Sequence, residues 1–285
     1  MSGKLTVALL GQPNSGKSTV FNALTGLHQH VGNWPGKTVE KKEGSFSHGG
    51  TEYTLADLPG SYSLSANSDE EVITRDFILS GRADVVCILA DSSQLERSLF
   101  MAADYAGITV PCFLALNMAD VASSQGKSVD VAVLERRLGV PVVLFSANDR
   151  KGYAPFYAAL ERAVSEKTML DAGALAQEYG KIAGYGELQS LIPDGIVPGC
   201  SPMWLAAKVL ENDPVVIAKL QNAMQASSLA KLDAARKGTQ GAVAAGSAKF
   251  AWIDGLLSGA ASERQQAVSL GRLDRIFTSR VWGKP

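Results

Sequence analysis

The chain has 285 residues, of which 46% are hydrophobic, and its 27 basic and 28 acidic side chains give a formal net charge of −1. This balance excludes a strongly basic nucleic-acid binder and an acidic disordered chain. The length suits two domains of ordinary size, each able to bury a core.

The first part of the chain has the pattern of an α/β domain. From Leu5 to about Lys167, β-rich apolar runs alternate with amphipathic stretches, which predicts βαβ units and a mostly parallel sheet of six strands. The second and third strands are separated only by His48-Gly49-Gly50, so we expect them to pair antiparallel. Strands are expected at residues 5–10, 39–47, 53–57, 85–91, 111–117 and 140–146, and helices from residue 16 and at 70–80, 95–106, 129–138 and 153–167.

The second part has a helical pattern. After residue 167 the strand signal disappears and a periodicity rich in Ala, Leu and Gln takes over, which predicts a domain boundary. The expected domains are therefore residues 1–168, a helical domain at 169–277 and a short end segment at 278–285. Helices are expected at 171–182, 203–210, 214–237, 247–257 and 270–277.

Neither part carries the features of a membrane span or of a secreted protein. No apolar run approaches the roughly 20 residues that a span needs, and the N-terminus lacks a signal-peptide core. The three cysteines show no metal-ligand spacing, and two lie in apolar runs typical of buried strands. We therefore expect a soluble polypeptide in a reducing, cytoplasmic compartment.

A phosphate-binding loop is predicted directly after the first strand. The run Gly11-Gln12-Pro13-Asn14-Ser15-Gly16-Lys17-Ser18 lies between a strand and a helix, as such a loop requires. Its backbone N–H groups are expected to bind the β-phosphate at a helix N-terminus, with Lys17 reaching the β and γ oxygens. The hydroxyl of Ser18 is then expected to bind Mg²⁺.

Two further motifs end later strands. Asp57-Leu58-Pro59-Gly60 follows the third strand, where an aspartate can hold a Mg²⁺ water and a glycine N–H can sense the γ-phosphate. Asn117-Met118-Ala119-Asp120 follows the fifth, where the aspartate can accept from guanine N1 and N2. Ser146-Ala147 ends the sixth, where a backbone N–H can meet guanine O6.

These motifs in this order resemble the G1, G3, G4 and G5 motifs of translation-factor-like small GTPases over residues 5 to about 167. The resemblance implies a Ras-like P-loop GTPase domain that prefers guanine. The missing G2 element must be a threonine between the first helix and the second strand, and Thr38 is the candidate. Met118 replaces the usual lysine of the G4 motif, from which we expect weaker nucleotide binding and fast exchange.

The segment Val31-Gly-Asn-Trp-Pro-Gly-Lys-Thr-Val-Glu40 narrows the resemblance. With the motifs above and the helical second part, it is similar to the cytoplasmic N-terminal part of ferrous-iron transporter B (FeoB). The run from Leu273 to Pro285 resembles the segment that precedes the family's first membrane span. The resemblance implies a fragment of a polytopic Fe²⁺ transporter of the inner membrane, with a helical domain that slows GDP release.

The resemblance also implies the make-up of the site. GTP or GDP, Mg²⁺ and K⁺ are the expected ligands, and hydrolysis is expected to be K⁺-stimulated. Catalysis is assigned to Asn14, Lys17, Thr38 and Gly60; Mg²⁺ to Ser18, Thr38 and Asp57; and K⁺ to Asn14 with carbonyls of Gly32 and Trp34. The expected nucleotide contacts are Gly11, Gln12, Pro13, Asn14, Ser15, Gly16, Lys17, Ser18, Thr19, Trp34, Pro35, Gly36, Lys37, Thr38, Asp57, Leu58, Pro59, Gly60, Asn117, Met118, Asp120, Ser146, Ala147 and Asn148.

Expected partners are the membrane permease domain of the same full-length chain, small cytoplasmic accessory proteins and a second copy of the chain. The alternative is a soluble Era-like GTPase acting in ribosome or tRNA maturation. Residues 169–285 carry only 12 basic and 10 acidic groups and no Gly-X-X-Gly clamp, so no nucleic-acid partner is expected. Trp34 is expected to be exposed, because its neighbours are polar.

Overall fold

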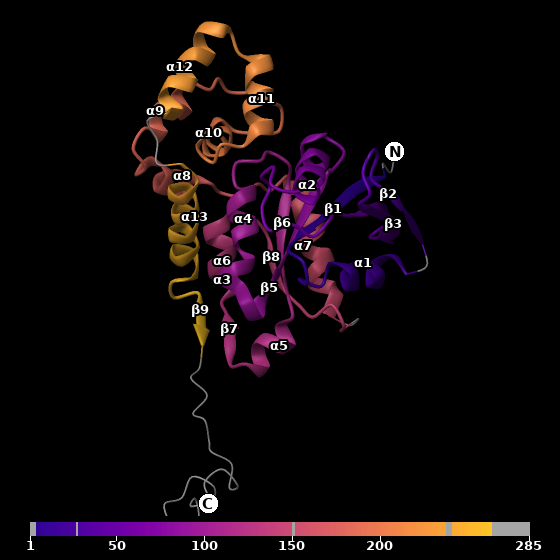
Figure 1. Cartoon of the computed structure of the whole chain (residues 1–285). Coiled ribbons are helices and arrows are strands. Elements are labelled where there is room, and N and C mark those ends of the chain that lie inside the picture. The colour runs from indigo at the N-terminus through magenta and orange to yellow at the C-terminus, as the bar shows by residue number, and fades with distance from the viewer. Residues whose placement is uncertain (1–3, 27, 150–151, 238–240, 264–285) are drawn as a thin grey trace, which may run out of the picture.

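The structure, a computed structural model, describes residues 4–26, 28–149, 152–237 and 241–263. A mostly parallel sheet forms its centre (Figure 1). In spatial order its strands are β2 (Gln29–Asn33), β3 (Glu40–His48), β4 (Thr51–Asp57), β1 (Leu5–Gly11), β5 (Val85–Asp91), β6 (Cys112–Asn117) and β8 (Val142–Leu144). The pairs β2–β3 and β3–β4 are antiparallel and the other pairs are parallel. The predicted hairpin of the second and third expected strands is confirmed.

The sheet has seven strands, so the expectation of six was one short. The additional strand, β2, forms the edge and pairs antiparallel with β3. Its sequence Gln-His-Val-Gly-Asn contains one apolar side chain, Val31, which is 63% exposed. Because backbone pairing rather than burial holds this strand, it left no hydrophobic pattern to recognise.

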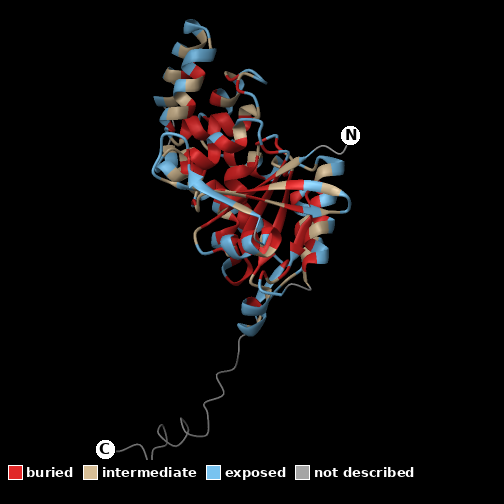
Figure 2. Cartoon of the chain, turned by 90° about the vertical axis from the view of Figure 1, so that its right-hand side faces the viewer, coloured by how far each residue is buried: buried red, intermediate tan, exposed pale blue. Residues whose placement is uncertain are grey.

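Each face of the sheet has its own buried cluster, because successive residues of a strand point to opposite sides. Val7 and Leu9 of β1 pack with α1 (Lys17–Thr25) and α7 (Tyr153–Glu166). Ala8 and Leu10 belong to the second cluster. That cluster includes side chains of α2 (Asp69–Leu79), α3 (Leu95–Ser98), α4 (Phe100–Tyr105) and α6 (Val131–Leu138). Figure 2 shows the buried residues concentrated in the sheet and in the helices that cover it.

The second part of the chain is helical, as predicted, and shares the second cluster. The helices are α8 (Gly173–Gly180), α9 (Tyr185–Ser190), α10 (Pro202–Leu210), α11 (Pro214–Ala223), α12 (Ala226–Lys237) and α13 (Gly241–Leu257). The single helix expected at 214–237 is two helices, because Met224 is extended. The helix α13 lies against α4 and α6, which brings the two parts of the chain together (Figure 1). The helix expected at 270–277 and the end segment at 278–285 lie outside the described residues.

Four short elements complete the fold. The 3-10 helix η1 (Ser92–Gln94) follows β5, and α5 (Ala119–Ser124) follows β6. The strands β7 (Lys127–Val129) and β9 (Ala261–Glu263) pair antiparallel in a separate small sheet, so strand structure does return after residue 167. In the described part of the chain, no helix is both long enough and apolar enough to cross a bilayer.

Candidate guanine-nucleotide site

The predicted motifs meet at one edge of the sheet, where the carboxyl ends of parallel strands lie together. The phosphate loop follows β1, Asp57 ends β4, Asn117 ends β6, and Ser146 follows β8. In open α/β sheets this is the edge where ligands bind. The fold therefore brings together residues that are far apart in the sequence.

The phosphate loop depends on two left-handed residues. Asn14 has φ 66° and Gly16 has φ 89°, and Gly16 is the residue that precedes the first turn of α1. A side chain at Gly16 would overlap the amide nitrogen of Asn117. Glycine is thus required at position 16 both for its backbone conformation and for the close approach of Asn117.

Lys17 is held back within the loop. It is buried, and its ammonium donates to the carbonyl oxygens of Gly11 at 3.1 Å and Gln12 at 3.3 Å. A side chain at Gly60 would stand 3.2 Å from the Lys17 Nζ, so the Asp-X-X-Gly segment lies directly beside this ammonium. The N–H of Ser61 donates to the carbonyl of Gly11 at 3.4 Å.

The phosphate end of the site holds buried polar atoms that lack a partner within the described residues. They are Ser15 Oγ, Asp57 Oδ1 and Ser61 Oγ. Buried polar groups in proteins are almost always hydrogen-bonded, so unsatisfied ones mark the place of a ligand, an ion or water. By contrast, Asn14, Ser18 and Thr19 are exposed at the mouth of the same loop.

Burial perturbs the two charged groups of this end in the way a ligand site requires. Desolvation lowers the pKa of Lys17, and the charge of Asp57 partly opposes this shift. Desolvation raises the pKa of Asp57, opposed by Lys17 and Lys42. Each charged form is thus under-stabilised by the protein itself, which is the condition under which a phosphate or a cation adds most.

Asn117 connects the phosphate loop to the base-binding end. Its Nδ2 donates to the Ser15 carbonyl at 2.9 Å, and its Oδ1 accepts from the Ala147 N–H at 2.8 Å. Tyr153 donates to the Ala147 carbonyl at 3.0 Å. The side chain of Asn117 therefore braces both loops.

Asp120 stands free in solvent at the start of α5, apart from Ser146. The Ser146 hydroxyl donates to Asp120 Oδ1 at 2.7 Å and accepts from the Asp120 N–H at 3.2 Å. The hydrogen bond from Ser146 lowers the pKa of Asp120, so the carboxylate is charged at neutral pH. A charged acceptor at this position suits the N1–H and N2–H donors of guanine, while Asn148 is exposed beside it.

Met118 packs on the phosphate loop. It has φ 61°, and its terminal methyl would lie 3.9 Å from a side chain at Gly16. The thioether therefore occupies the position of an aliphatic stem above the loop but carries no ammonium group.

Trp34 is buried, which corrects the expectation of an exposed indole. The residue is 5% exposed, and its ring meets Phe77 of α2 edge to face, with centroids 5.5 Å apart. Lys41 lies over the ring at 5.5 Å. The indole thus anchors the loop before β3 on α2. The polar neighbours in the sequence misled the prediction, because the apolar pocket comes from a distant helix.

The rest of this loop faces solvent. Residues 35–38, including Thr38, are exposed, and Lys37 pairs with Asp69 at the start of α2 at 2.7 Å. The Trp34 carbonyl accepts the Lys37 N–H at 3.0 Å, and Gly32 pairs with Lys41 in the β2–β3 ladder. Of the two carbonyls expected to bind K⁺, that of Trp34 is thus hydrogen-bonded within the loop, and that of Gly32 lies in the paired strand β2.

A groove of about 1120 Å³ opens next to the site, between α3, α5 and α13. Gln12 and Tyr62 reach its wall, and Gln12 donates to the Arg97 carbonyl at 2.8 Å. Lys17, Ser18, Asp57 and Asp120 do not line it. Of the nucleotide motifs only Gln12 and Ala119 reach this groove, so it lies beside the phosphate-binding side chains.

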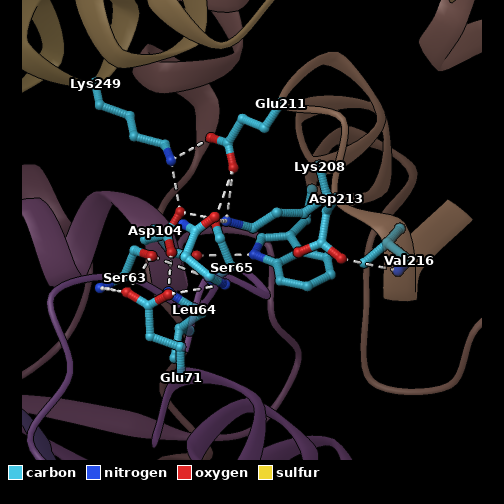
Figure 3. Close-up of polar contacts among 12 residues, drawn as sticks. Ser63, Leu64, Ser65, Glu71, Asp104, Lys208, Glu211, Asp213, Val216 and Lys249 are labelled. Carbon is cyan, nitrogen blue, oxygen red and sulfur yellow. Dashed lines mark hydrogen bonds and ion pairs between the residues drawn. The ribbon is translucent and has the colours of Figure 1, made fainter. Parts of the chain in front are cut away.

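A buried ion cluster joins the segment after Gly60 to the helical part, and the sequence did not predict it (Figure 3). Asp104 of α4 accepts from Lys208 of α10 and from Lys249 of α13, each at 2.6 Å. Both lysines also contact Glu211. The Leu64 N–H donates to Asp104, and the Ser65 hydroxyl, 3.1 Å from Glu211, donates there.

Charge pairing dominates the titration of this cluster. Although burial opposes ionisation, the two lysines hold the pKa of Asp104 and of Glu211 below their ordinary values. The same acids hold the pKa of Lys249 above its ordinary value despite its burial. A sequence signal existed, because Lys208 is the one charged residue in the otherwise apolar stretch Pro202–Leu210.

Comparisons with known proteins agree with this geometry. The family model described as Ferrous iron transport protein B matches residues 5–160. The chain belongs to the FeoB family. A second family model, the FeoB cytosolic helical domain, matches residues 183–251. The FeoB N-terminal G domain, with a Ras-like fold, and its helical domain are therefore both present, and the Era-like alternative is not favoured.

Curated relatives carry the same name. The Fe(2+) transporter FeoB of Escherichia coli (strain K12) is 37% identical over 214 residues, covering 74% of this chain and 27% of that protein. FeoB of Salmonella typhimurium is 46% identical over 163 residues, covering 56% of this chain and 21% of that protein. The chain thus spans about a quarter of the length of these relatives.

Solved structures match over most of the chain. The cytosolic domain of T. maritima FeoB in its GMPPNP form has a TM-score of 0.75 and 31% identity, covering 91% of this chain and 100% of that chain. A mutant of S. thermophilus NFeoB bound to GDP has a TM-score of 0.76 and 31% identity, covering 90% and 100%. Both relatives were solved with a guanine nucleotide.

Proposed function

We propose that this chain binds GTP and hydrolyses it to GDP and phosphate, as the regulatory domain of a ferrous-iron transporter. The proposal rests on one observation, which is that the phosphate end and the base-binding end of the site are joined. Unpartnered polar atoms and Lys17 surround the phosphate loop, and Asn117 ties that loop to a charged Asp120. Only a ligand with both phosphates and a guanine-like base uses both halves.

The residues present fit Mg²⁺ at the phosphate end. The hydroxyl of Ser18, the carboxylate of Asp57 and the hydroxyl of Thr38 are the hard oxygen donors that Mg²⁺ prefers. Asp57 Oδ1 is a buried acceptor without a partner among the described residues, so it is available to a cation or to its water. Mg²⁺ there would neutralise phosphate charge.

A monovalent cation also fits, with one rearrangement. The exposed amide of Asn14 and the carbonyls of Gly32 and Trp34 are oxygen donors suited to K⁺. The Trp34 carbonyl accepts from Lys37 in this structure, so the rearrangement is that the loop turns this oxygen, which has a second lone pair, toward the ion. K⁺ would supply the positive charge that an arginine supplies in related enzymes.

The chain's own residues then have separate tasks. Lys17 and the N–H groups of the phosphate loop bind and orient the phosphates, and the Gly60 N–H detects the γ-phosphate. Ser61 and Tyr62 stand where Ras-like enzymes place a water-orienting glutamine. We therefore assign the positioning of the attacking water to backbone groups of the loop that carries Thr38.

The helical part is proposed to sense the nucleotide through the buried ion cluster. Leu64 and Ser65 belong to the segment that follows Gly60 and Ser61, and their N–H and hydroxyl donate to Asp104 and Glu211. We also propose that the boundary between the two domains lies near residue 168. The proposed partner is the membrane permease domain of the full-length protein, and the proposed location is the cytoplasmic face of the inner membrane. Met118, which lacks a lysine's ammonium, supports fast nucleotide exchange.

The test compares GTP hydrolysis in K⁺ and in Na⁺ at equal ionic strength with saturating Mg²⁺-GTP. We expect turnover about tenfold or more faster in K⁺, because a fixed cation stabilises the developing charge. The Asn14→Ala variant is expected to lose this difference. Asn222→Ala, at an exposed position of α11, is the matched control and is expected to keep it.

Two outcomes would contradict the proposal at different levels. Equal rates in the two salts, or a difference that survives in Asn14→Ala, would remove the role of K⁺ and leave the GTPase. No phosphate release above buffer in either salt, together with no binding of a fluorescent guanine nucleotide, would remove the GTPase itself.

A further inference from the structure

The small sheet β7–β9 ties the end of α13 to the base-binding end of the nucleotide site. Lys127, Ser128 and Val129 of β7 stand opposite Glu263, Ser262 and Ala261 of β9. The hydroxyls of Ser128 and Ser262 lie 2.8 Å apart. The strand β7 comes directly after α5, whose start carries Asp120.

Further hydrogen bonds hold the small sheet and the end of α13 from the side of α6. Arg137 donates to the carbonyls of Leu256 at 2.6 Å and Ser258 at 2.8 Å, at the C-terminal end of α13, where a cation also suits the helix dipole. The Asp130 N–H donates to the Ala260 carbonyl at 2.7 Å. The residues that lead into β9 are therefore held by Arg137 and Asp130, and β9 itself is held by β7.

Lys127 connects the small sheet to the guanine motif through η1. Its ammonium, half-buried, donates to the Ser93 carbonyl of η1 at 2.7 Å. The neighbouring Ser92 donates its hydroxyl to the Asn117 carbonyl at 2.6 Å, in a buried position. A continuous path thus runs from β9 through Lys127 and η1 to Asn117, which braces the phosphate loop and Ala147.

We propose that Lys127 is a positioning residue of the guanine pocket, and that β9 holds β7 so that Lys127 reaches η1. The inference rests on the proposed guanine-nucleotide binding. Without the bond from Lys127 to Ser93, η1 loses this hydrogen bond to β7, and the carbonyl side of Asn117 loses a fixed support. The bound nucleotide then dissociates faster, although no atom of Lys127 is assigned to contact it.

The experiment measures release of a fluorescent GDP analogue from the full chain by stopped flow. Lys127→Met is expected to release it about threefold to tenfold faster than the parent, which is the range for residues that act through a network. Lys127→Arg, which can still donate to Ser93, is expected to restore the parent rate. Lys181→Met, at an exposed residue that directly follows α8, is the matched control and is expected to leave release unchanged.

A second variant tests the role of β9. Ser262→Pro removes one backbone N–H from the small sheet and disfavours its pairing, while Lys127 stays in place. We expect release to accelerate in the same direction and by less than in Lys127→Met. Melting curves of the nucleotide-free variants accompany both measurements, because a purely structural role lowers the melting temperature without changing the release rate.

The outcomes separate this inference from the proposed function. If the parent chain binds no guanine nucleotide, the proposed function fails and the inference fails with it. If the parent binds and Lys127→Met releases at the parent rate, the inference alone is wrong. A faster release in Lys127→Met that Lys127→Arg does not restore would also overturn it, because donation to Ser93 would then not be the cause.

Discussion

Two aspartates show how differently this chain treats buried charge. Asp57 at the nucleotide site has one carboxylate oxygen with no partner in the described structure, and burial raises its pKa. Asp104 at the junction with the helical part accepts from two lysines and a backbone N–H, and pairing lowers its pKa. The first carboxylate is left for a ligand, whereas the second is already satisfied within the protein.

The difference teaches where folding and binding each obtain their stability. A buried charge without a partner is unfavourable until a counter-charge arrives, so its site is suited to bind. A buried charge in a complete network adds little by itself but is costly to disrupt. On this basis, substitutions at the junction should affect folding first, and substitutions at the phosphate loop should affect binding first.

The largest effect is expected from breaking the junction. Asp104→Asn removes the charge that faces Lys208 and Lys249 and leaves two buried ammonium groups with one carboxylate, Glu211. We expect a loss of about 3 to 5 kcal/mol in the free energy of unfolding, measured by urea denaturation. Asp254→Asn, at an exposed position of α13, is the matched control and should stay within about 0.5 kcal/mol of the parent.

A destabilisation below about 1 kcal/mol for Asp104→Asn would break the comparison. It would mean that the two lysines find other partners or lose their charge without cost. The release rate of fluorescent GDP, measured on the folded fraction, then shows whether the segment after Gly60 has lost its attachment to Asp104.

A smaller effect is expected from pH. Asp104 and Glu211 have pKa values below those of ordinary carboxyls, so their contribution is fully present above about pH 5. This contribution declines once pH falls below about 4, where the carboxyls of the unfolded chain take up protons. It is lost completely as pH falls through the lowered pKa values of the folded protein. Denaturation curves from pH 6 to pH 3 should therefore show a decline on the order of 2 kcal/mol from one such group. A stability that does not fall over this range contradicts the pairing, and the slope should be shallower in Asp104→Asn.

Local patterns predicted most of the sheet and both halves of the nucleotide site. The strands expected at 85–91 and 53–57 coincide with β5 and with most of β4, because apolar β-branched runs ending in Asp leave a clear signal. The phosphate loop was also predictable from the sequence, because its chemistry depends on consecutive residues.

Features that depend on distant partners were missed. Trp34 is buried by Phe77 of α2, and nothing in its own neighbourhood indicates that pocket. Lys208 stands out as the one charge in the apolar stretch Pro202–Leu210, but its partner Asp104 is distant in the sequence and is brought to it only by the packing of α4. Likewise, β2, β7 and β9 contain no buried residue and are held by backbone pairing, so they lack a hydrophobic pattern.

The smallest effect on folding, with a large one on binding, is expected at the site itself. The raised pKa of Asp57 means that folding favours its protonated form, so at neutral pH the charged carboxylate does not stabilise the nucleotide-free protein. Any contribution from this group is present at low pH and lost as pH rises through the raised pKa. Asp57→Asn, measured without nucleotide, should therefore change the free energy of unfolding by less than about 1 kcal/mol. The same variant should lose the part of GTP affinity that depends on Mg²⁺, measured by titration with and without the ion, because its amide cannot replace the charged ligand. If Asp57→Asn instead unfolds the chain as Asp104→Asn is expected to, the carboxylate is a structural group, and the contrast between a site that waits for its ligand and a junction that is already paired no longer holds.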